Sequence, residues 1–189
     1  MNEHLSSTES TSEPPLADGE GEPPEPGLRV PIANEQASLP IDESRLEAAV
    51  RAVFEPSGYD SGSVSIAVVD DPTIHKINRQ YLQHDYPTDV LSFVLEADEP
   101  FLEGELVVST DTAAKNAESL SWTAHDELTL YVIHGALHLV GYRDKQPDEA
   151  DEMRTAEAKI LAELGIQLPS GDDRWTDASP SSTREAPGS

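Results

Sequence analysis

Residues 131–144 read YVIHGALHLVGYRD, and this segment gives the clearest indication of the architecture and chemistry of the chain. Its apolar run predicts a helix on which His134 and His138, four residues apart, project from the same face. Gly141 can adopt a left-handed conformation, which would end the helix and let the chain fold back. Asp144 follows three residues later, where its carboxylate can reach the same ion. We therefore predict one metal site formed by His134, His138 and Asp144.

The spacing H-x3-H-x2-G-x2-D resembles the zinc motif of the metzincins, with aspartate in place of the third histidine. Two histidines at this spacing are also compatible with core positions, but the glycine and the acid at their offsets favour a metal. Two imidazoles and one carboxylate leave a coordination position open, which is typical of catalytic sites. Zinc is the expected ion, and the carboxylate leaves manganese, nickel or iron open. The other histidines are not expected to be ligands: His4, His75, His84 and His125.

The residue after the first histidine argues against a protease. Zincin proteases carry a glutamate there as general base, and this chain has Gly135. Peptide hydrolysis by that route is therefore disfavoured, whereas phosphodiester cleavage depends more on the metal and on charge stabilisation. Asp89, Glu105 and Arg143 are candidate catalytic helpers that the sequence does not rank.

The surrounding sequence predicts helices and strands in alternation, from hydrophobic periodicity and from proline and glycine at element ends. Strands are expected at 63–71, 89–96 and 104–110, and helices at 41–58, 72–82, 111–120, from Ser121 or Thr123 to Val140, and 147–165. This order favours an α+β (α/β-like) fold in which a small mixed sheet is flanked by helices around a metzincin-like metal site.

Composition divides the chain into one domain and two tails. Residues 1–40 hold eight acidic residues, one basic residue and many prolines, which predicts a disordered acidic tail. Residues 169–189 are similar in composition and are also expected to be disordered. The folded, metal-dependent domain is then expected at 41–168.

The chain is strongly acidic. Its formal net charge is −25, and residues 41–168 alone contribute 25 acidic and nine basic residues, a net of −16. Such a surface repels nucleic acid at long range. The sequence contains no cysteine, no continuous apolar run of membrane-spanning length and no secretory signal, so we expect a cytoplasmic protein without a membrane partner.

Four segments of the chain form recognisable motifs: PTDVLSF (87–93), LEGELVVS (102–109), HGALHLVGYRD (134–144) and DEADEMRTAEAKILAELG (148–165). Together they resemble the YbeY family of metal-dependent endoribonucleases. The resemblance covers about residues 63–166. It implies a mixed sheet with helices and a zinc ion at the mouth of a cleft, held by His134, His138 and Asp144. It also implies single-strand-specific RNA cleavage in the cytoplasm, with a role in maturation of the 3′ end of 16S ribosomal RNA and in ribosome quality control.

The chain departs from the family pattern at several positions. Asp144 replaces a histidine, Arg143 stands where an aspartate is usual, and Glu105 also replaces an aspartate. Leu82 stands where the family has an arginine that is expected to contact substrate phosphate. Arg79, one helical turn earlier, is a candidate substitute.

Three classes of function remain open from the sequence. The first is an endoribonuclease that acts on ribosomal RNA or the ribosome and not on DNA. The second is a metal-dependent hydrolase of a peptide or a small phosphoester. The third is a non-catalytic ribosome-associated factor, which the acidity favours, since bare RNA would bind weakly to such a chain. A local basic rim or docking on ribosomal proteins, which are basic, would reconcile the acidity with an RNA substrate.

Overall fold

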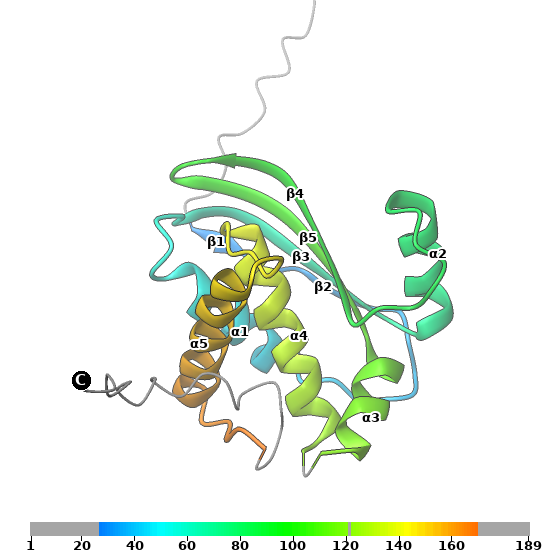
Figure 1. Cartoon of the computed structure of the whole chain (residues 1–189). Helices are drawn as coiled ribbons and strands as arrows, with labels where there is room; N and C mark the ends of the chain where they lie inside the picture. The colour runs from blue at the N-terminus through cyan, green and yellow to red at the C-terminus, as the bar shows by residue number, and fades with distance from the viewer. Residues whose placement is uncertain (1–26, 121, 170–189) are drawn as a thin grey trace, which may run out of the picture.

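The structure, a computed structural model, describes residues 27–120 and 122–169 (Figure 1). Within them, five strands form one mixed sheet and five helices pack around it, which confirms the predicted α+β class. Most of the predicted N-terminal tail, residues 1–26, and the C-terminal tail from residue 170 lie outside the described residues.

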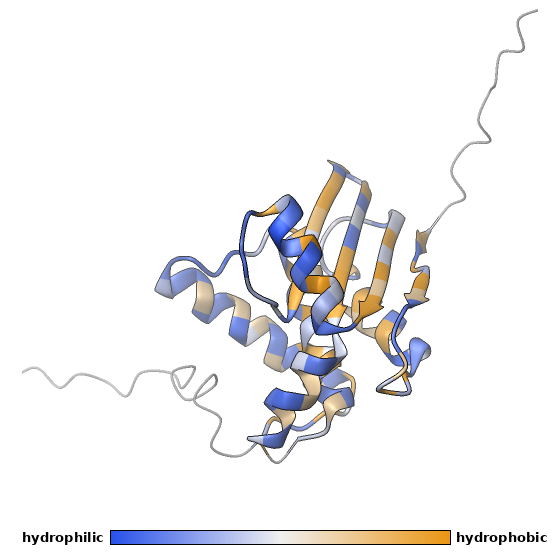
Figure 2. Ribbon diagram, turned by 90° about the vertical axis from the view of Figure 1, so that its right-hand side faces the viewer, coloured by the Kyte–Doolittle hydropathy of each residue, from blue (hydrophilic) through white to orange (hydrophobic). Residues whose placement is uncertain are grey.

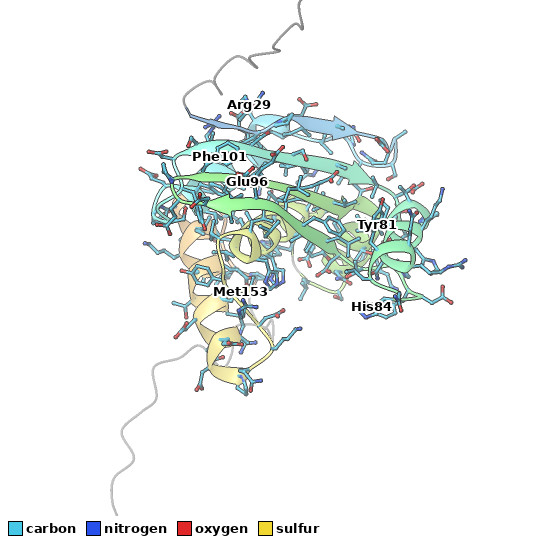
Figure 3. The ribbon with its side chains drawn as sticks, turned by 90° about the horizontal axis from the view of Figure 1, so that it is seen from above. Arg29, Tyr81, His84, Glu96, Phe101 and Met153 are labelled. Carbon is cyan, nitrogen blue, oxygen red and sulfur yellow. The ribbon has the colours of Figure 1, made fainter. Side chains whose placement is uncertain are left out.

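The centre of the sheet consists of β3 (Ser61–Val69) and β5 (Phe101–Ser109), which run parallel. β4 (Val90–Asp98) pairs antiparallel with β5 and forms one edge. The hairpin of β4 and β5 extends further than predicted, past Glu96 to Asp98 on β4 and from Phe101 on β5, so that it includes the acidic residues Asp98 and Glu103 (Figure 3). Because these side chains are exposed at the hairpin end, their charges stay solvated and do not oppose strand pairing.

The expectation that the tail extends to residue 40 is wrong for its last part. β1 (Leu28–Arg29) and β2 (Ile32–Asn34) pair parallel with β3 along the edge opposite β4. Pro31 between them accepts a hydrogen bond from Ile66 N at 2.9 Å. Residues 28–34 carry no acidic side chain, and an edge strand tolerates the missing donor of proline, so this part of the predicted tail completes the sheet.

Three helices cover one face of the sheet: α1 (Glu43–Phe54), α4 (Ala124–Leu139) and α5 (Pro147–Glu163) (Figure 1). They enclose the main hydrophobic core with the side chains that the strands direct to this face. Fully buried members of this core include Val50, Ile66, Leu106, Leu128, Ile133 and Leu161.

The other face is covered by α2 (Asp71–Tyr81), whose Ile74 packs on Val69, Leu91 and Val107. Figure 2 shows that the strands are predominantly hydrophobic, whereas α2 and α5 also carry many hydrophilic residues. α3 (Thr110–Glu118) follows β5 directly. No helix in the described part of the chain is both long enough and apolar enough to cross a membrane.

Candidate metal centre

The candidate centre is built on the C-terminal half of α4. The helix begins with a capping box, in which the Thr123 hydroxyl accepts from Asp126 N at 3.1 Å and the Asp126 carboxylate accepts from Thr123 N at 3.4 Å. Thr123 is thus the N-cap residue, in agreement with one of the two predicted alternatives. The other alternative, Ser121, lies outside the described residues. Contacts with the sheet, α1, α3 and α5 fix the position and rotation of the helix.

His134 and His138 are the only residues between positions 131 and 139 that are not buried. Their side chains are 28% and 29% exposed, and their Nε2 atoms lie 3.1 Å apart. The two rings meet edge to face with centroids 4.7 Å apart. The helical spacing therefore places both imidazoles together at the edge of the core, as predicted.

The chain turns back immediately after α4 at Gly141, whose φ is +99°. Gly141 N donates to the His138 carbonyl at 3.1 Å, and Tyr142 N donates to the Leu137 carbonyl at 3.0 Å. This pair of bonds is the Schellman arrangement that ends a helix at a left-handed glycine. The turn brings Asp144 back, with its Oδ2 3.7 Å from His138 Nε2 and 3.9 Å from His134 Nε2.

Hydrogen bonds on the far side of each ring fix which nitrogen faces the centre. His134 Nδ1 lies 2.7 Å from Glu157 Oε1, and His138 Nδ1 lies 3.0 Å from the Tyr142 carbonyl oxygen. Both oxygens are acceptors, so each Nδ1 carries a proton, and in the neutral form that a metal requires each ring directs the lone pair of its Nε2 toward the other. Two facing lone pairs repel unless a cation lies between them. Metal-binding histidines normally donate in this way, from the ring nitrogen that does not bind the metal to a carboxylate or a backbone carbonyl.

The geometry and chemistry of the three groups fit a divalent metal. One ligand atom from each of His134, His138 and Asp144 lies within 4.8 Å of the other two. A tetrahedral zinc ion with bonds of about 2.1 Å separates its ligand atoms by about 3.4 Å. The observed separations therefore need only small adjustments around an ion. The donor set suits zinc, and manganese, nickel or iron are also compatible with it.

The electrostatic surroundings of His134 also favour a cation. Burial lowers the pKa of this imidazole, but the hydrogen bond and the charge of Glu157, with smaller contributions from Asp89 and Asp144, raise it further, and the net shift is upward. The surroundings thus favour positive charge at the ring. The same negative potential attracts a metal ion.

A cavity of about 280 Å³ opens beside the cluster, between α4, α5, the loop that joins them and the start of β4. It is lined by Asp89, Leu130, Tyr131, His134, Asp144, Ala150, Met153, Arg154 and Glu157. A volume of this size accommodates part of an extended substrate next to the metal ligands.

Two functional residues of this cavity, Arg154 and Glu157, were not predicted from the sequence. Glu157 is only 6% exposed and lies on the buried stripe of α5 together with Met153 and Leu161. Glu157 is four residues from Met153 and four from Leu161, so the sequence already places this carboxylate on the apolar face of the helix. Since an unpaired charge is rarely buried, this pattern indicates that Glu157 has a partner inside the protein. No comparable pattern marks Arg154.

Tyr131 contributes a hydroxyl to the cavity wall. Burial raises the pKa of Tyr131 far above its usual value, and the charge and hydrogen bond of Glu127 raise it further. Asn116 Nδ2 donates to its oxygen at 2.8 Å. Tyr131 is therefore protonated at neutral pH and does not serve as a base.

Of the three helpers predicted from the sequence, the structure brings only Asp89 to the cavity. Glu105 pairs in register with Phe93, which packs on the α2 face of the sheet, and strand alternation turns Glu105 away from α4. Arg143 is exposed and lines a separate groove with Glu149 and Glu152. Neither is placed with the histidines.

Arg79, the predicted substitute for an arginine at position 82, is also remote from the cavity. It lies on an exposed part of α2, with its Nη1 3.9 Å from Asp85 Oδ1. Tyr81 and His84, on the same side of the molecule, are well separated from Met153, which lines the cavity (Figure 3). The structure thus gives Arg79 no contact with the candidate centre.

Comparison with known proteins agrees with this geometry. Residues 31–165 match the endoribonuclease YbeY family. This chain belongs to that family. The YbeY match begins before β2, which supports the inclusion of this strand in the domain.

Individual relatives extend the YbeY assignment. The endoribonuclease YbeY of Rhodopirellula baltica is 46% identical over 137 residues, which is 70% of this chain and 71% of the relative. That of Salinibacter ruber is 36% identical over 147 residues, which is 74% of this chain and 94% of the relative. The solution structure of TM1509 from Thermotoga maritima shares the fold, with a TM-score of 0.50 at 24% identity over 73% of this chain and 91% of the other.

Proposed function

We propose that this chain is a metal-dependent endoribonuclease that cleaves single-stranded RNA in the cavity between α4 and α5. One observation carries the proposal: in a chain of the YbeY family, two imidazole nitrogens and a carboxylate oxygen converge beside that cavity. The three ligands are His134, His138 and Asp144, and the expected ion is zinc, one per chain.

When bound, such an ion supplies Lewis-acid chemistry that draws electron density from a phosphoryl oxygen and stabilises developing negative charge. Glu157 holds the His134 ring, and the Tyr142 carbonyl holds the His138 ring, so that both Nε2 atoms face the centre. Because the rings are fixed before an ion or a substrate arrives, little reorganisation is needed.

Asp89 is the carboxylate that we propose as proton acceptor. Its Oδ1 accepts hydrogen bonds from Thr88 Oγ1 and from Val90 N, both at 2.8 Å, which fix the orientation of the group. It shares the cavity with His134 and Asp144, so we propose that it accepts the proton of the water molecule that attacks the scissile phosphate.

The proposed substrate is ribosomal RNA, with maturation of the 3′ end of 16S ribosomal RNA and ribosome quality control in the cytoplasm as the role. Residues 41–168 carry a net charge of −16, which opposes binding of bare RNA. Docking on basic ribosomal proteins would bring the cavity to its substrate despite this charge.

Metal removal tests the function directly. The purified full-length chain is expected to contain about one zinc ion per molecule and to cleave a single-stranded RNA in preference to a duplex. A chelator should abolish cleavage, and added zinc or manganese should restore it.

Cleavage that is unaffected by chelation would contradict the proposal. Co-sedimentation with ribosomes in the absence of any RNA cleavage would instead support a non-catalytic ribosome-associated factor.

Replacement of Glu157 by glutamine tests the support of His134. Removal of the charge behind the ring is expected to weaken zinc affinity by about 10- to 100-fold. Competition with a fluorescent chelator measures this affinity. Glu163→Gln on the same helix is the matched control, because Glu163 is exposed and lies beside Lys159 instead of a ligand. Equal zinc affinities of the two variants would show that Glu157 does not support the centre.

A further inference from the structure

Among the described residues that line the cavity beside the metal centre, Arg154 is the only lysine or arginine. It comes from α5, one residue after Met153 and three before Glu157. The rest of the charged lining is acidic: Asp89, Asp144 and Glu157. A cavity built for an RNA phosphate needs a positive group in addition to a metal, and Arg154 is positioned to supply it.

The charge balance of the cavity depends on Arg154. Three carboxylates outweigh one guanidinium, so the lining without an ion has a net charge of −2 when His134 is neutral. A divalent ion brings this sum to zero. A phosphate then meets no net repulsion from the lining, and the guanidinium is the one fixed cation of the lining that can bind it.

The guanidinium is only partly engaged. Its Nη2 contacts Asp151 Oδ1 three residues earlier on the same helix. Its Nε is buried, and within the described residues it has no hydrogen-bond partner. Because the Nε atom is closed to solvent, a phosphate oxygen can meet the guanidinium only at its Nη groups.

The contact with Asp151 does not prevent binding of a ligand. The Arg154 side chain is 31% exposed and that of Asp151 is 48% exposed, so solvent screens this ion pair. Replacing the Asp151 carboxylate by a phosphate as the partner of Arg154 therefore costs little free energy. Arginine also presents more than one N–H edge, which lets it keep one carboxylate while it binds a second oxyanion.

We propose that Arg154 binds a phosphate of the RNA strand in the cavity, through its Nη groups, and so positions the strand beside the metal centre. This inference rests on the function proposed above, because it takes RNA as the ligand. It assigns Arg154 to substrate binding and requires no part for it in zinc binding.

The test measures binding separately from cleavage. The zinc-loaded full-length chain is titrated with a 2′-O-methyl single-stranded RNA oligonucleotide at several salt concentrations, and affinity is read from fluorescence anisotropy. Arg154→Gln is expected to weaken binding by about 10- to 100-fold. The slope of log affinity against log salt should fall by about 0.7, which corresponds to one lost phosphate contact on a single strand. Arg154→Lys should recover part of the loss.

Two variants separate this role from a structural one. Lys159→Gln on the same helix removes the same charge from an exposed side chain outside the cavity, and its affinity should stay within about twofold of the parent. Asp151→Asn breaks the same ion pair but leaves the guanidinium free, and it should bind RNA as tightly as the parent or more tightly. Zinc content should be the same in all variants.

Several results would overturn the inference: equal affinities of Arg154→Gln and Lys159→Gln, equal losses in Arg154→Gln and Asp151→Asn, or no binding of the oligonucleotide by the parent chain. If binding depends on Arg154 but no natural RNA is cleaved, the proposed function fails and this inference stands.

Discussion

His138→Ala is expected to abolish zinc binding and RNA cleavage together. The substitution removes one of three ligands from a centre in which the Nε2 atoms of the two histidines are only 3.1 Å apart. His134 and Asp144 alone leave a zinc ion with too few protein ligands for tight binding. Zinc content should fall to background, and cleavage of single-stranded RNA should fall by at least about 1,000-fold. Metal analysis and an RNA cleavage assay on the same preparation measure both.

The fold should survive this substitution. The His138 side chain is 29% exposed, and its hydrogen bond to the Tyr142 carbonyl is local. We expect a change in the free energy of unfolding of no more than about 1 kcal/mol. His75→Ala is the matched control, because His75 lies on α2, outside the cavity, and is paired with Asp85. Full activity of the His138 variant would exclude the proposed centre.

The convergence of the three candidate ligands could be predicted because they lie within eleven consecutive residues. Helical spacing and one glycine turn fix the relation of His134, His138 and Asp144 without knowledge of the rest of the fold. Glu157 and Arg154 come from a different helix, and their place beside His134 follows from how α5 packs on α4. Local sequence patterns do not predict how these two helices pack on each other.

The mistaken expectations have equally specific causes. Glu105 is correctly assigned to a strand, but which face it occupies depends on register with β4, and it lies on the face covered by α2. β1 and β2 consist of two and three residues, too short for a hydrophobic pattern, and they form only because the edge of β3 is available. In both cases a partner strand decides the outcome.

Gly135→Glu is expected to unfold the protein, although it restores the residue that zincin proteases use as general base. A Cβ atom at Gly135 would lie 2.8 Å from Val90 Cγ2, 2.9 Å from Leu106 Cδ2 and 3.0 Å from Ser92 Oγ. Position 135 thus faces the sheet at close contact. A glutamate there overpacks the interface and buries a carboxylate without a partner, which should cost more than about 4 kcal/mol.

Chemical denaturation followed by circular dichroism tests this expectation. Gly135→Ala should already cost about 1–3 kcal/mol, whereas Ala162→Glu, which adds the same carboxylate at an exposed position of α5, should be neutral within about 0.5 kcal/mol. A folded Gly135→Glu variant with the stability of the parent would show that α4 does not need its close contact with β4 and β5.

The close packing at Gly135 also limits which reactions the site can catalyse. The Gly135 carbonyl accepts a hydrogen bond from Ser92 Oγ at 3.1 Å, so α4 is held against β4 at the helical position next to His134. The close contact of Gly135 with β4, which fixes the helix next to His134, therefore leaves no room for a side chain at position 135. Because a protease of the zincin type needs a glutamate at that position, the packing that builds this metal centre closes that route to peptide hydrolysis. Phosphodiester cleavage does not need a glutamate at position 135. The metal would stabilise the negative charge, and the proposed proton acceptor Asp89 and phosphate ligand Arg154 lie elsewhere in the cavity.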